Sequence, residues 1–490
     1  MGKFERNTIA NLGGTIWSVL LGLVCVPLLI RFLGAEAFGL VGLFLTLQSI
    51  FAFLDLGVGA TLNREIARLS ATASDPGEPR DLVFTLQAIY WAAAIVIAIA
   101  TIVFAPFIAG VWLKPHSLPI AAVTASVRMM GAAIALQFPF VFYQCGMLGL
   151  QRHVLFNTLS AVVAALRSAG ILLLVAFVNR TPQMYFGGQI VVSAGATIAS
   201  AVLLWRILPS SGGRRSRFRR DLLQRVWRFS TAWSVNSLAT LALLQGDRIV
   251  LSTVLPLEMF GWYALAQRLA AGLYAIIIAV DGVIFPHFSG AVATGDEREI
   301  AHVYHRGAQV MAVLLIPAAV VTALFSREVL TLLTRDAAAV RNAHLVLTLL
   351  AAGMLLHGLF QAPYYMQLAY GRWRLISTTN AVLVATILPL YVIGGKMFGA
   401  VGAAAVFVLL NLGWAVTMPL MHRRFVRGEE RRWLVHDVSL PLAGAFGAAA
   451  VAFVLLPRGT GVVQLLLFLA VAGLATLGAT AVAAPDIRSL

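Results

Sequence analysis

Long apolar stretches, many of them 18 residues or more, recur along this sequence between short polar segments. As a helix, a stretch of that length crosses the roughly 30 Å hydrocarbon core of a bilayer. It must be helical there, because a helix satisfies its own backbone hydrogen bonds where no water is present. Charged residues make up only 11% of the chain, against about 25% in a soluble domain. The sequence therefore predicts an all-α polytopic membrane protein.

About fourteen transmembrane helices are predicted from these stretches. The first follows Lys3 and Arg6 without a small-residue cleavage site, so we expect it to be retained rather than removed as a signal peptide. An even number of spans places both termini on one side of the membrane. The predicted spans are 8–33, 38–63, 82–110, 118–148, 153–178, 183–206, 227–254, 259–288, 300–325, 342–369, 375–397, 399–421, 438–456 and 461–483.

The basic residues indicate which side holds the termini. Of the 36 Lys and Arg residues, 24 fall on the face of the N-terminus, eight on the opposite face and four within spans. Because cytoplasmic loops carry the excess of Lys and Arg, both termini are predicted to be cytoplasmic. Adding or removing one span would destroy this alternation, which supports the count of fourteen.

The net charge of +16 does not indicate a nucleic-acid partner, because the basic residues lie in short loops between spans. Anionic lipid headgroups are the expected partner of such loops. Cys25 and Cys145 each lie inside a predicted span, so we expect no disulfide and no metal site. The sequence also lacks a G-x-x-x-x-G-K-[ST] phosphate loop, an H-E-x-x-H pair and a G-x-S-x-G elbow. We therefore predict a carrier without a cofactor rather than an enzyme, driven by substrate gradients, by H⁺ or Na⁺ coupling, or by the membrane potential.

The segment Leu208–Asp221, which reads LPSSGGRRSRFRRD, is the most hydrophilic part of the chain. It is either an ordinary cytoplasmic loop or a linker between two lobes. An internal repeat favours the linker, since EAFG at 36–39 and EMFG at 258–261 open the second and eighth predicted spans, 222 residues apart. Two six-helix bundles related by an axis along the membrane normal would follow. The predicted parts are an N-lobe (1–206), a basic linker (207–225), a C-lobe (226–423) and an accessory hairpin (437–484), whose bland composition indicates lipid contact and packing.

Polar side chains share helix faces inside several predicted spans. At 100° per residue, positions i, i+4, i+11 and i+18 fall within about 40° of one another. On the eighth span these positions hold Tyr263, Gln267, Tyr274 and Asp281. Contacts between helices explain one or two such residues, whereas a water-filled cavity explains the whole stripe. Similar faces are predicted on the second span (Gln48, Asp55, Gly59), the seventh (Asn236, Thr240, Asp247) and the tenth (His357, Gln361, Tyr364, with a kink at Pro363).

Four arginines lie within predicted spans: Arg128, Arg167, Arg248 and Arg268. Ionisable groups at membrane depth are costly and face a partner or water, so each is a functional candidate. Arg binds phosphate in a bidentate manner, which suits a diphosphate or an anionic sugar. They could instead be neutralised structurally by Asp55, Asp247 and Asp281, which are also candidates for ion coupling or gating. For Arg248, next to Asp247, the two interpretations are equally supported. Arg128 has no acid nearby in sequence and is the better substrate candidate.

Several segments resemble a known family. RFLGAEAFG at 31–39, LDLG at 54–57 and the pair Asn63-Arg64 are similar to the N-terminal signature of the polysaccharide transport family, which contains the Wzx-type O-antigen flippases. GDRIVL at 246–251 and FGWYALAQRL at 260–269 resemble the opening of that family's second lobe. The resemblance covers roughly residues 5–425.

The resemblance implies the fold of the multidrug/oligosaccharidyl-lipid/polysaccharide (MOP) exporter superfamily, with two six-helix bundles in a V around a central cavity. It implies movement of a polyprenyl-diphosphate-linked oligosaccharide, such as an O-antigen, capsule or exopolysaccharide unit, across the bacterial inner membrane by alternating access. Polysaccharide polymerase and chain-length machinery are expected partners. Fourteen spans also match lipid II flippases, although the dense Arg cluster of their first helices is not seen. A drug or cation antiporter is a further candidate, as is a membrane glycosyltransferase or ligase, which would need a large external catalytic loop that the sequence lacks.

Overall fold

The structure is a computed structural model that describes residues 21–22, 24–53, 55, 57–72, 77–209, 214–456 and 461–488. These residues contain no strand, and helices make up 89% of the structure. Within this described part of the chain, eleven helices are long and apolar enough to cross a membrane. The predicted all-α membrane fold is therefore confirmed.

The count of fourteen spans remains a prediction. One of the eleven candidates, Arg374–Phe425, holds the two predicted spans 375–397 and 399–421. Helix α15 (Trp373–Ala415) consists of two helical arms that meet at Gly399, whose φ of 61° lies in the left-handed region that favours glycine. The chain folds back there and brings the two arms close together. A side chain at Gly402 would strike the carbonyl of Gly394. The predicted first span begins outside the described residues, and the side chains of the seventh lie mostly outside them.

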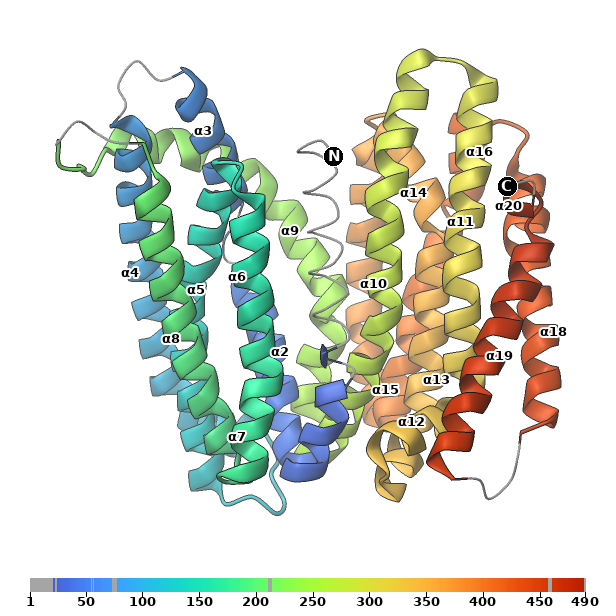
Figure 1. Cartoon of the computed structure of the whole chain (residues 1–490), viewed down its shortest axis with the longest axis horizontal. Coiled ribbons are helices and arrows are strands. Elements are labelled where there is room, and N and C mark those ends of the chain that lie inside the picture. The colour runs from blue at the N-terminus through green and yellow to red at the C-terminus, as the bar shows by residue number, and fades with distance from the viewer. Residues whose placement is uncertain are drawn as a thin grey trace. The chain divides into compact units, whose positions relative to one another are not determined.

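The chain forms two compact units, residues 1–261 and 262–490. Apart from a short apolar helix at Val24–Leu33, the first unit contains the helices that run from blue to green in Figure 1. They are α2 (Ala35–Phe53), α3 (Val58–Thr72), α4 (Glu78–Phe107), η1 (Ile108–Trp112), α5 (Ile120–Gly149), α6 (His153–Ala165), η2 (Leu166–Gly170), α7 (Ile171–Phe177), α8 (Pro182–Ile207) and α9 (Arg220–Val254), where η marks a π-helical segment.

The prediction of a continuous second span over 38–63 is wrong. Helix α2 ends at Phe53 and α3 begins at Val58, with Gly57 at a φ of 77° between them. Asp55 lies in this turn, and its carboxylate accepts the backbone N–H of Gly59 at 3.0 and 3.2 Å. A carboxylate in this position satisfies an N–H of the first helical turn, which has no partner within the helix. Asp55 therefore starts a new helix.

The two copies of the internal repeat meet. A side chain at Gly39 would strike the carbonyl oxygen of Leu257, and one at Gly261 would strike the carbonyl oxygen of Ala35. The two contacts are reciprocal, since residues 35 and 257 are 222 positions apart, as are residues 39 and 261. Both glycines are required because backbone atoms occupy the space of a side chain. The repeated glycine thus serves close packing between α2 and the first turn of α10 (Leu257–Thr294).

Glu36, the glutamate of the first repeat copy, joins another segment of unit 1 to α2. The Glu36 carboxylate is 7% exposed and accepts the backbone N–H groups of His116, Ser117 and Leu118 at 2.5, 2.9 and 3.2 Å. It also accepts the Ser117 hydroxyl. Glu36 therefore fixes the connection between η1 and α5 against the start of α2.

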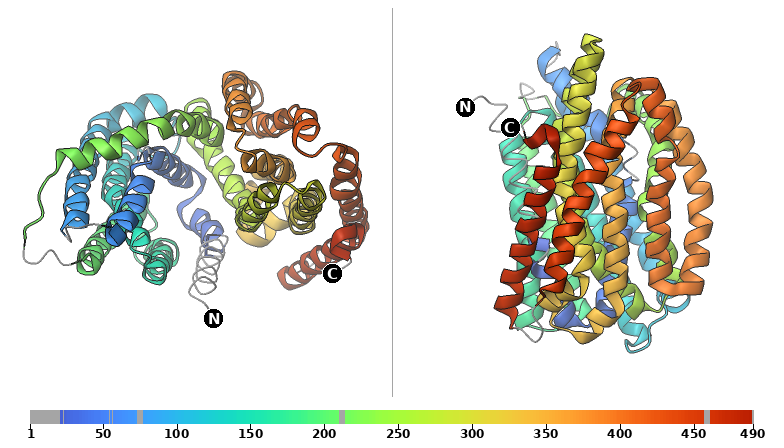
Figure 2. Two further views of the ribbon diagram at one scale, coloured as in Figure 1. Left: turned by 90° about the horizontal axis from the view of Figure 1, so that it is seen from above. Right: turned by 90° about the vertical axis from the view of Figure 1, so that its right-hand side faces the viewer.

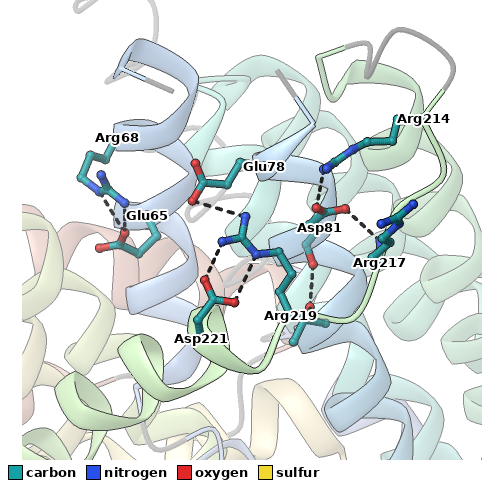
Figure 3. A network of polar contacts seen from close by, with 9 residues as sticks. Glu65, Arg68, Glu78, Asp81, Arg214, Arg217, Arg219 and Asp221 are labelled. Atoms are coloured by element: carbon teal, nitrogen blue, oxygen red, sulfur yellow. Dashed lines mark hydrogen bonds and ion pairs between the residues drawn. The ribbon is translucent and has the colours of Figure 1, made fainter. Parts of the chain in front are cut away.

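Residues 214–221 of the basic linker are held against α4 rather than free. The buried Asp81 carboxylate, in the first turn of α4, pairs with the Arg214 guanidinium and accepts the Arg217 backbone N–H at 2.8 Å (Figure 3). The Arg219 guanidinium pairs with Asp221 at 2.5 Å, and this ion pair lowers the pKa of the exposed Asp221 carboxyl. The linker therefore lies against the start of α4 before α9 begins at Arg220.

Unit 2 contains α10 from Trp262 onward and all later helices, and its last helical hairpin is shown in Figure 2. Both helices of that hairpin contact α11. The bounds are α11 (Glu297–Leu324), α12 (Ser326–Thr334), α13 (Ala337–Leu359), α14 (Gln361–Ala369), α15, α16 (Met418–Phe425), α17 (Glu430–Arg432), η3 (Trp433–Ser439), α18 (Leu440–Val454), α19 (Val462–Ala483) and α20 (Pro485–Arg488).

A buried polar cluster, which we call the hairpin clasp, joins this hairpin to α11. His305 on α11 is fully buried and pairs through Nδ1 with the fully buried Asp437 carboxylate of η3. Its Nε2 lies 3.1 Å from Glu429. One turn further along α11, the Gln309 amide donates to Asp437 at 2.8 Å and to Asp486 of α20 at 3.1 Å. The two ends of the hairpin are thus held by the same face of α11.

We predict that Asp437→Ala lowers the free energy of unfolding by about 3–5 kcal/mol, because it breaks the buried pair with His305 and also removes one of the two hydrogen bonds of the buried Gln309 amide. Thermal unfolding of the detergent-solubilised protein measures this. The control is Glu430→Ala, at an exposed position next to Glu429, which should unfold at the wild-type temperature. Equal unfolding temperatures for the two variants would contradict the clasp.

Candidate functional site

A cluster of polar and aromatic side chains lies inside unit 2, and we call it the Asp281 cluster. Its members come from α10, α13, α14 and α15. The break between α13 and α14 positions two of these helices. Pro363 lacks an N–H, and its ring excludes the carbonyl of residue 359 from a regular helix. Helix α13 accordingly ends at Leu359, and Gln361 begins α14. The kink predicted at Pro363 is confirmed.

Hydrogen bonds run through the cluster in one chain. The Gln361 amide donates to the Asp281 carboxylate at 3.0 Å and lies 3.5 Å from His357 Nε2. His357 Nδ1 lies 3.2 Å from the side-chain oxygen of Asn411, and Tyr365 donates its hydroxyl to Asp281. The carboxylate is 7% exposed, and its second oxygen has no hydrogen-bond partner among the described residues.

Aromatic rings surround this chain of hydrogen bonds. The centres of the Tyr274 and His357 rings lie 5.9 Å apart. The centre of the Tyr364 ring lies 5.2 Å from that of Tyr365 and 6.1 Å from that of Trp414. Tyr and Trp combine an apolar face with a polar tip, so they can pack against a carbohydrate ring while donating a hydrogen bond. The cluster therefore offers neutral polar groups, aromatic faces and one carboxylate.

The Asp281 carboxylate is the acidic group of this cluster. The hydrogen-bond partners of Asp281 within the described residues are the neutral Gln361 and Tyr365. An ionised carboxylate buried in a membrane helix is costly unless a cation accompanies it. Asp281 can therefore take up a proton or hold a small cation. The described residues contain no group of three or more His, Cys, Asp or Glu side chains suited to a bound metal.

The structure brings together five of the predicted site residues: Tyr274, Asp281, His357, Gln361 and Tyr364. Tyr263 and Gln267 lie on the same helix, α10, closer to its start. Three cluster members were missed, namely Tyr365, Asn411 and Trp414. Tyr365 directly follows Tyr364, so helical periodicity assigns it to another face. Asn411 and Trp414 lie on α15, and only the polar character of Asn411 in an apolar span could have indicated them.

The predicted residues of unit 1 form a second set. Gln48 of α2 donates to the Gln137 side chain of α5. The predicted face shared by Gln48, Asp55 and Gly59 does not exist as such, because the helix is broken between residues 53 and 58. Asp55 instead accepts the Tyr90 hydroxyl of α4 in addition to capping α3. Its observed contacts are those of a structural residue within unit 1.

Two of the intramembrane arginines lie in unit 1 apart from any described carboxylate partner. Arg128 of α5 is exposed and makes no hydrogen bond or ion pair with a described residue. Arg167 lies in the π-helical segment η2, donates to Ser193 at 3.3 Å and stacks over the Phe140 ring at 5.9 Å. The prediction that Asp and Arg neutralise each other gains no support at these two positions.

The remaining predicted residues lie on α9 and α10. Asp247 is 2% exposed, and Arg248 donates to the Gln245 side chain at 3.0 Å. Tyr263 is fully buried and Arg268 partly so. The side chain of Asn236 lies outside the described residues.

Comparison with known proteins decides the family. Residues 4–292, more than half of the chain, match the family described as "Polysaccharide biosynthesis protein". The chain belongs to this family. Its membership in the polysaccharide flippase group of the MOP superfamily, predicted from the resemblance of its motifs, is confirmed.

Two curated relatives match over most of their length. The chain is 24% identical to the "Uncharacterized membrane protein EpsK" of Bacillus subtilis over 465 residues, which cover 90% of the chain and 87% of the relative. It is 22% identical to the "Probable flippase AglR" of Haloferax volcanii over 427 residues, which cover 84% of the chain and 82% of that relative.

Solved structures share the fold of this polysaccharide-family member. The lipid II flippase MurJ in an inward closed conformation aligns with a TM-score of 0.73 at 11% identity, over 97% of this chain and 98% of MurJ. An inward-facing multidrug resistance transporter of the MATE family, also of the MOP superfamily, aligns with a TM-score of 0.65 at 14% identity, over 87% of this chain and 99% of that chain. At these identities the likeness establishes the MOP fold.

Proposed function

We propose that this chain moves a polyprenyl-diphosphate-linked oligosaccharide from the cytoplasmic to the periplasmic leaflet of a bacterial inner membrane. The saccharide would be a repeat unit of O-antigen, capsule or exopolysaccharide, and the polyprenyl tail would stay in lipid during transport. On the periplasmic side the product would pass to polymerase and chain-length machinery. Transport would proceed by alternating access, driven by H⁺ or Na⁺ coupling or by the membrane potential.

The Asp281 cluster is the observation that carries this proposal beyond family membership. Polar and ionisable side chains at membrane depth are costly and occur where they serve a substrate or ion pathway. Here amide, imidazole and phenol groups surround one carboxylate, and aromatic rings lie beside them. This combination suits recognition of a sugar, while Asp281 supplies a group for coupling. Arg128 is the proposed contact for the diphosphate, because it is exposed and without a described partner.

Deletion of the gene tests the proposal. We expect the deletion strain to accumulate the lipid-linked saccharide on the cytoplasmic leaflet and to lose its surface polysaccharide, and the wild-type gene to restore both. In proteoliposomes, the purified chain should make the same lipid-linked saccharide accessible to an enzyme added outside. Accumulation of lipid II would indicate a peptidoglycan precursor instead. Drug sensitivity with normal surface polysaccharide would indicate an antiporter, and either result would contradict the proposal.

A further inference from the structure

A second site lies in unit 1, where α3, the end of α5 and the start of α6 surround a cavity of about 550 Å³. Pockets that bind small ligands commonly have volumes of about 300–1,000 Å³. The flanking segments carry Arg64 and Arg152, which belong to the face predicted to be cytoplasmic. None of the cavity's lining residues belongs to the Asp281 cluster.

The polar side chains of the cavity are amides and one imidazole. Asn63 comes from α3, Gln151 from the turn before α6, and His153 and Asn157 from α6. Amide and neutral imidazole groups each donate and accept hydrogen bonds, and no carboxylate or lysine lines the cavity. Sugar hydroxyl and acetamido groups need partners that can do both. Phe156 adds an aromatic ring, which can pack against the C–H face of a sugar.

Two backbone features position the residues that line the cavity. A side chain at Gly149 would come within 2.7 Å of the Asn63 carbonyl oxygen, so this glycine lets α3 lie against the end of α5. Gln151 has a φ of 57°, in the left-handed region that residues other than glycine rarely adopt. Backbone strain of this kind persists where the surrounding structure enforces it and is frequent at ligand sites. The turn thereby directs Gln151 and His153 to the same cavity.

One buried polar atom of a lining residue lacks a partner in the described part of the chain. His153 Nδ1 is inaccessible to solvent and has no hydrogen-bond partner among the described residues. Buried polar atoms are nearly always satisfied, so an exception requires an explanation. In the sequence, the exposed Arg152 lies between the lining residues Gln151 and His153, and its guanidinium makes no hydrogen bond or ion pair with a described residue. An unengaged guanidinium beside a pocket that no carboxylate lines suits a phosphate attached to a sugar.

We propose that this cavity binds the sugar of the lipid-linked saccharide on the cytoplasmic side, with Arg152 contacting the diphosphate before it reaches Arg128. The proposal rests on the proposed function and adds a recognition site in unit 1 to the cluster in unit 2. It assigns to Asn63, His153 and Asn157 the selection of substrate by its saccharide rather than by its lipid. The polyprenyl diphosphate alone should therefore bind without help from these residues.

Binding by the full-length protein in vesicles of phosphatidylethanolamine and phosphatidylglycerol tests this. One probe is the lipid-linked saccharide that accumulates in the deletion strain, and the other is the same polyprenyl diphosphate without sugar. Competition with a fluorescent polyprenyl diphosphate gives both affinities. The wild type should prefer the sugar-bearing probe about tenfold, the sum of a few hydrogen bonds. Asn63→Ala should reduce this preference about fivefold. Ala67→Trp, which places a large ring at an exposed lining position, should reduce it at least as far.

Two matched controls accompany these variants. Asn179→Ala changes an exposed amide in the connection between α7 and α8, and Ser70→Trp adds the same ring to α3 outside the cavity lining. Both should retain the wild-type preference. Equal wild-type affinity for the two probes would overturn the sugar site alone, as would a preserved preference in both cavity variants. A variant that weakens both probes equally would overturn the assignment to the sugar. Failure of the wild type to bind either probe would contradict the proposed function as well.

Discussion

Asp281→Asn is expected to reduce transport of the lipid-linked saccharide about tenfold or more, because the coupling ion or proton loses a charged acceptor, an interaction that contributes about 1.5–3 kcal/mol. Asparagine keeps the size of the side chain and can still accept from Gln361, which donates to Asp281 at 3.0 Å. It can neither release a proton nor balance a cation. The variant should therefore fold normally and fail in coupling. Restoration of surface polysaccharide in the deletion strain, together with the proteoliposome assay, measures the loss.

A second measurement separates coupling from recognition. If Asp281 couples transport to an ion, the wild-type rate should respond to an imposed H⁺ or Na⁺ gradient, whereas the residual Asp281→Asn rate should not. Asp296→Asn is the matched control, since Asp296 is exposed and accepts the N–H groups that begin α11, a role that asparagine also fills. Full restoration of surface polysaccharide by Asp281→Asn would contradict the assignment of this cluster to transport.

Gly261→Ala is expected to lower the free energy of unfolding by at least about 1–3 kcal/mol, the usual cost of overpacking. The added methyl group would strike the Ala35 carbonyl oxygen and lie 3.1 Å from the Gly39 nitrogen. Both neighbours are backbone atoms, so no side chain can rotate away to relieve the contact. Thermal unfolding in detergent measures the effect, which should appear with Gly39→Ala as well.

Gly282→Ala provides the control on the same helix, because a side chain there would meet nothing within 4 Å. It should leave the unfolding temperature unchanged or raise it, since alanine favours helix over glycine. The double variant Gly39→Ala/Gly261→Ala should cost less than the sum of the single variants, because once one methyl group has pushed α2 and α10 apart the second meets less resistance. Wild-type stability of Gly261→Ala would contradict the reciprocal contact.

The helices that cross the membrane could be predicted from the sequence because span length is set by bilayer thickness. The predicted spans 118–148 and 183–206 correspond to α5 (Ile120–Gly149) and α8 (Pro182–Ile207). The predicted span 38–63 failed because average hydropathy does not register a turn. Asp55 and Gly57 carried that signal, as a helix-capping residue followed by a glycine able to adopt positive φ.

The candidate site could be predicted only along single helices. Periodicity placed Tyr274 with Asp281 on α10 and His357 with Gln361 near the break at Pro363. It could not show that these two pairs meet, nor that Asn411 completes the chain of hydrogen bonds from another helix. The repeat at 36–39 and 258–261 likewise indicated duplication, whereas the contact between its copies required the tertiary structure.

The turn at Gly399 limits how the topology of this protein can be mapped. Helix α15 passes directly from one span to the next there, and the two arms pack glycine against glycine at residues 394 and 402. A reporter tag inserted at this turn would push the arms apart and unfold the region it was meant to locate. Asn179 is a better insertion point on the same predicted face, because it is exposed and lies between the end of α7 and the start of α8. The predicted topology expects tags placed there and at the C-terminus to report opposite sides of the membrane.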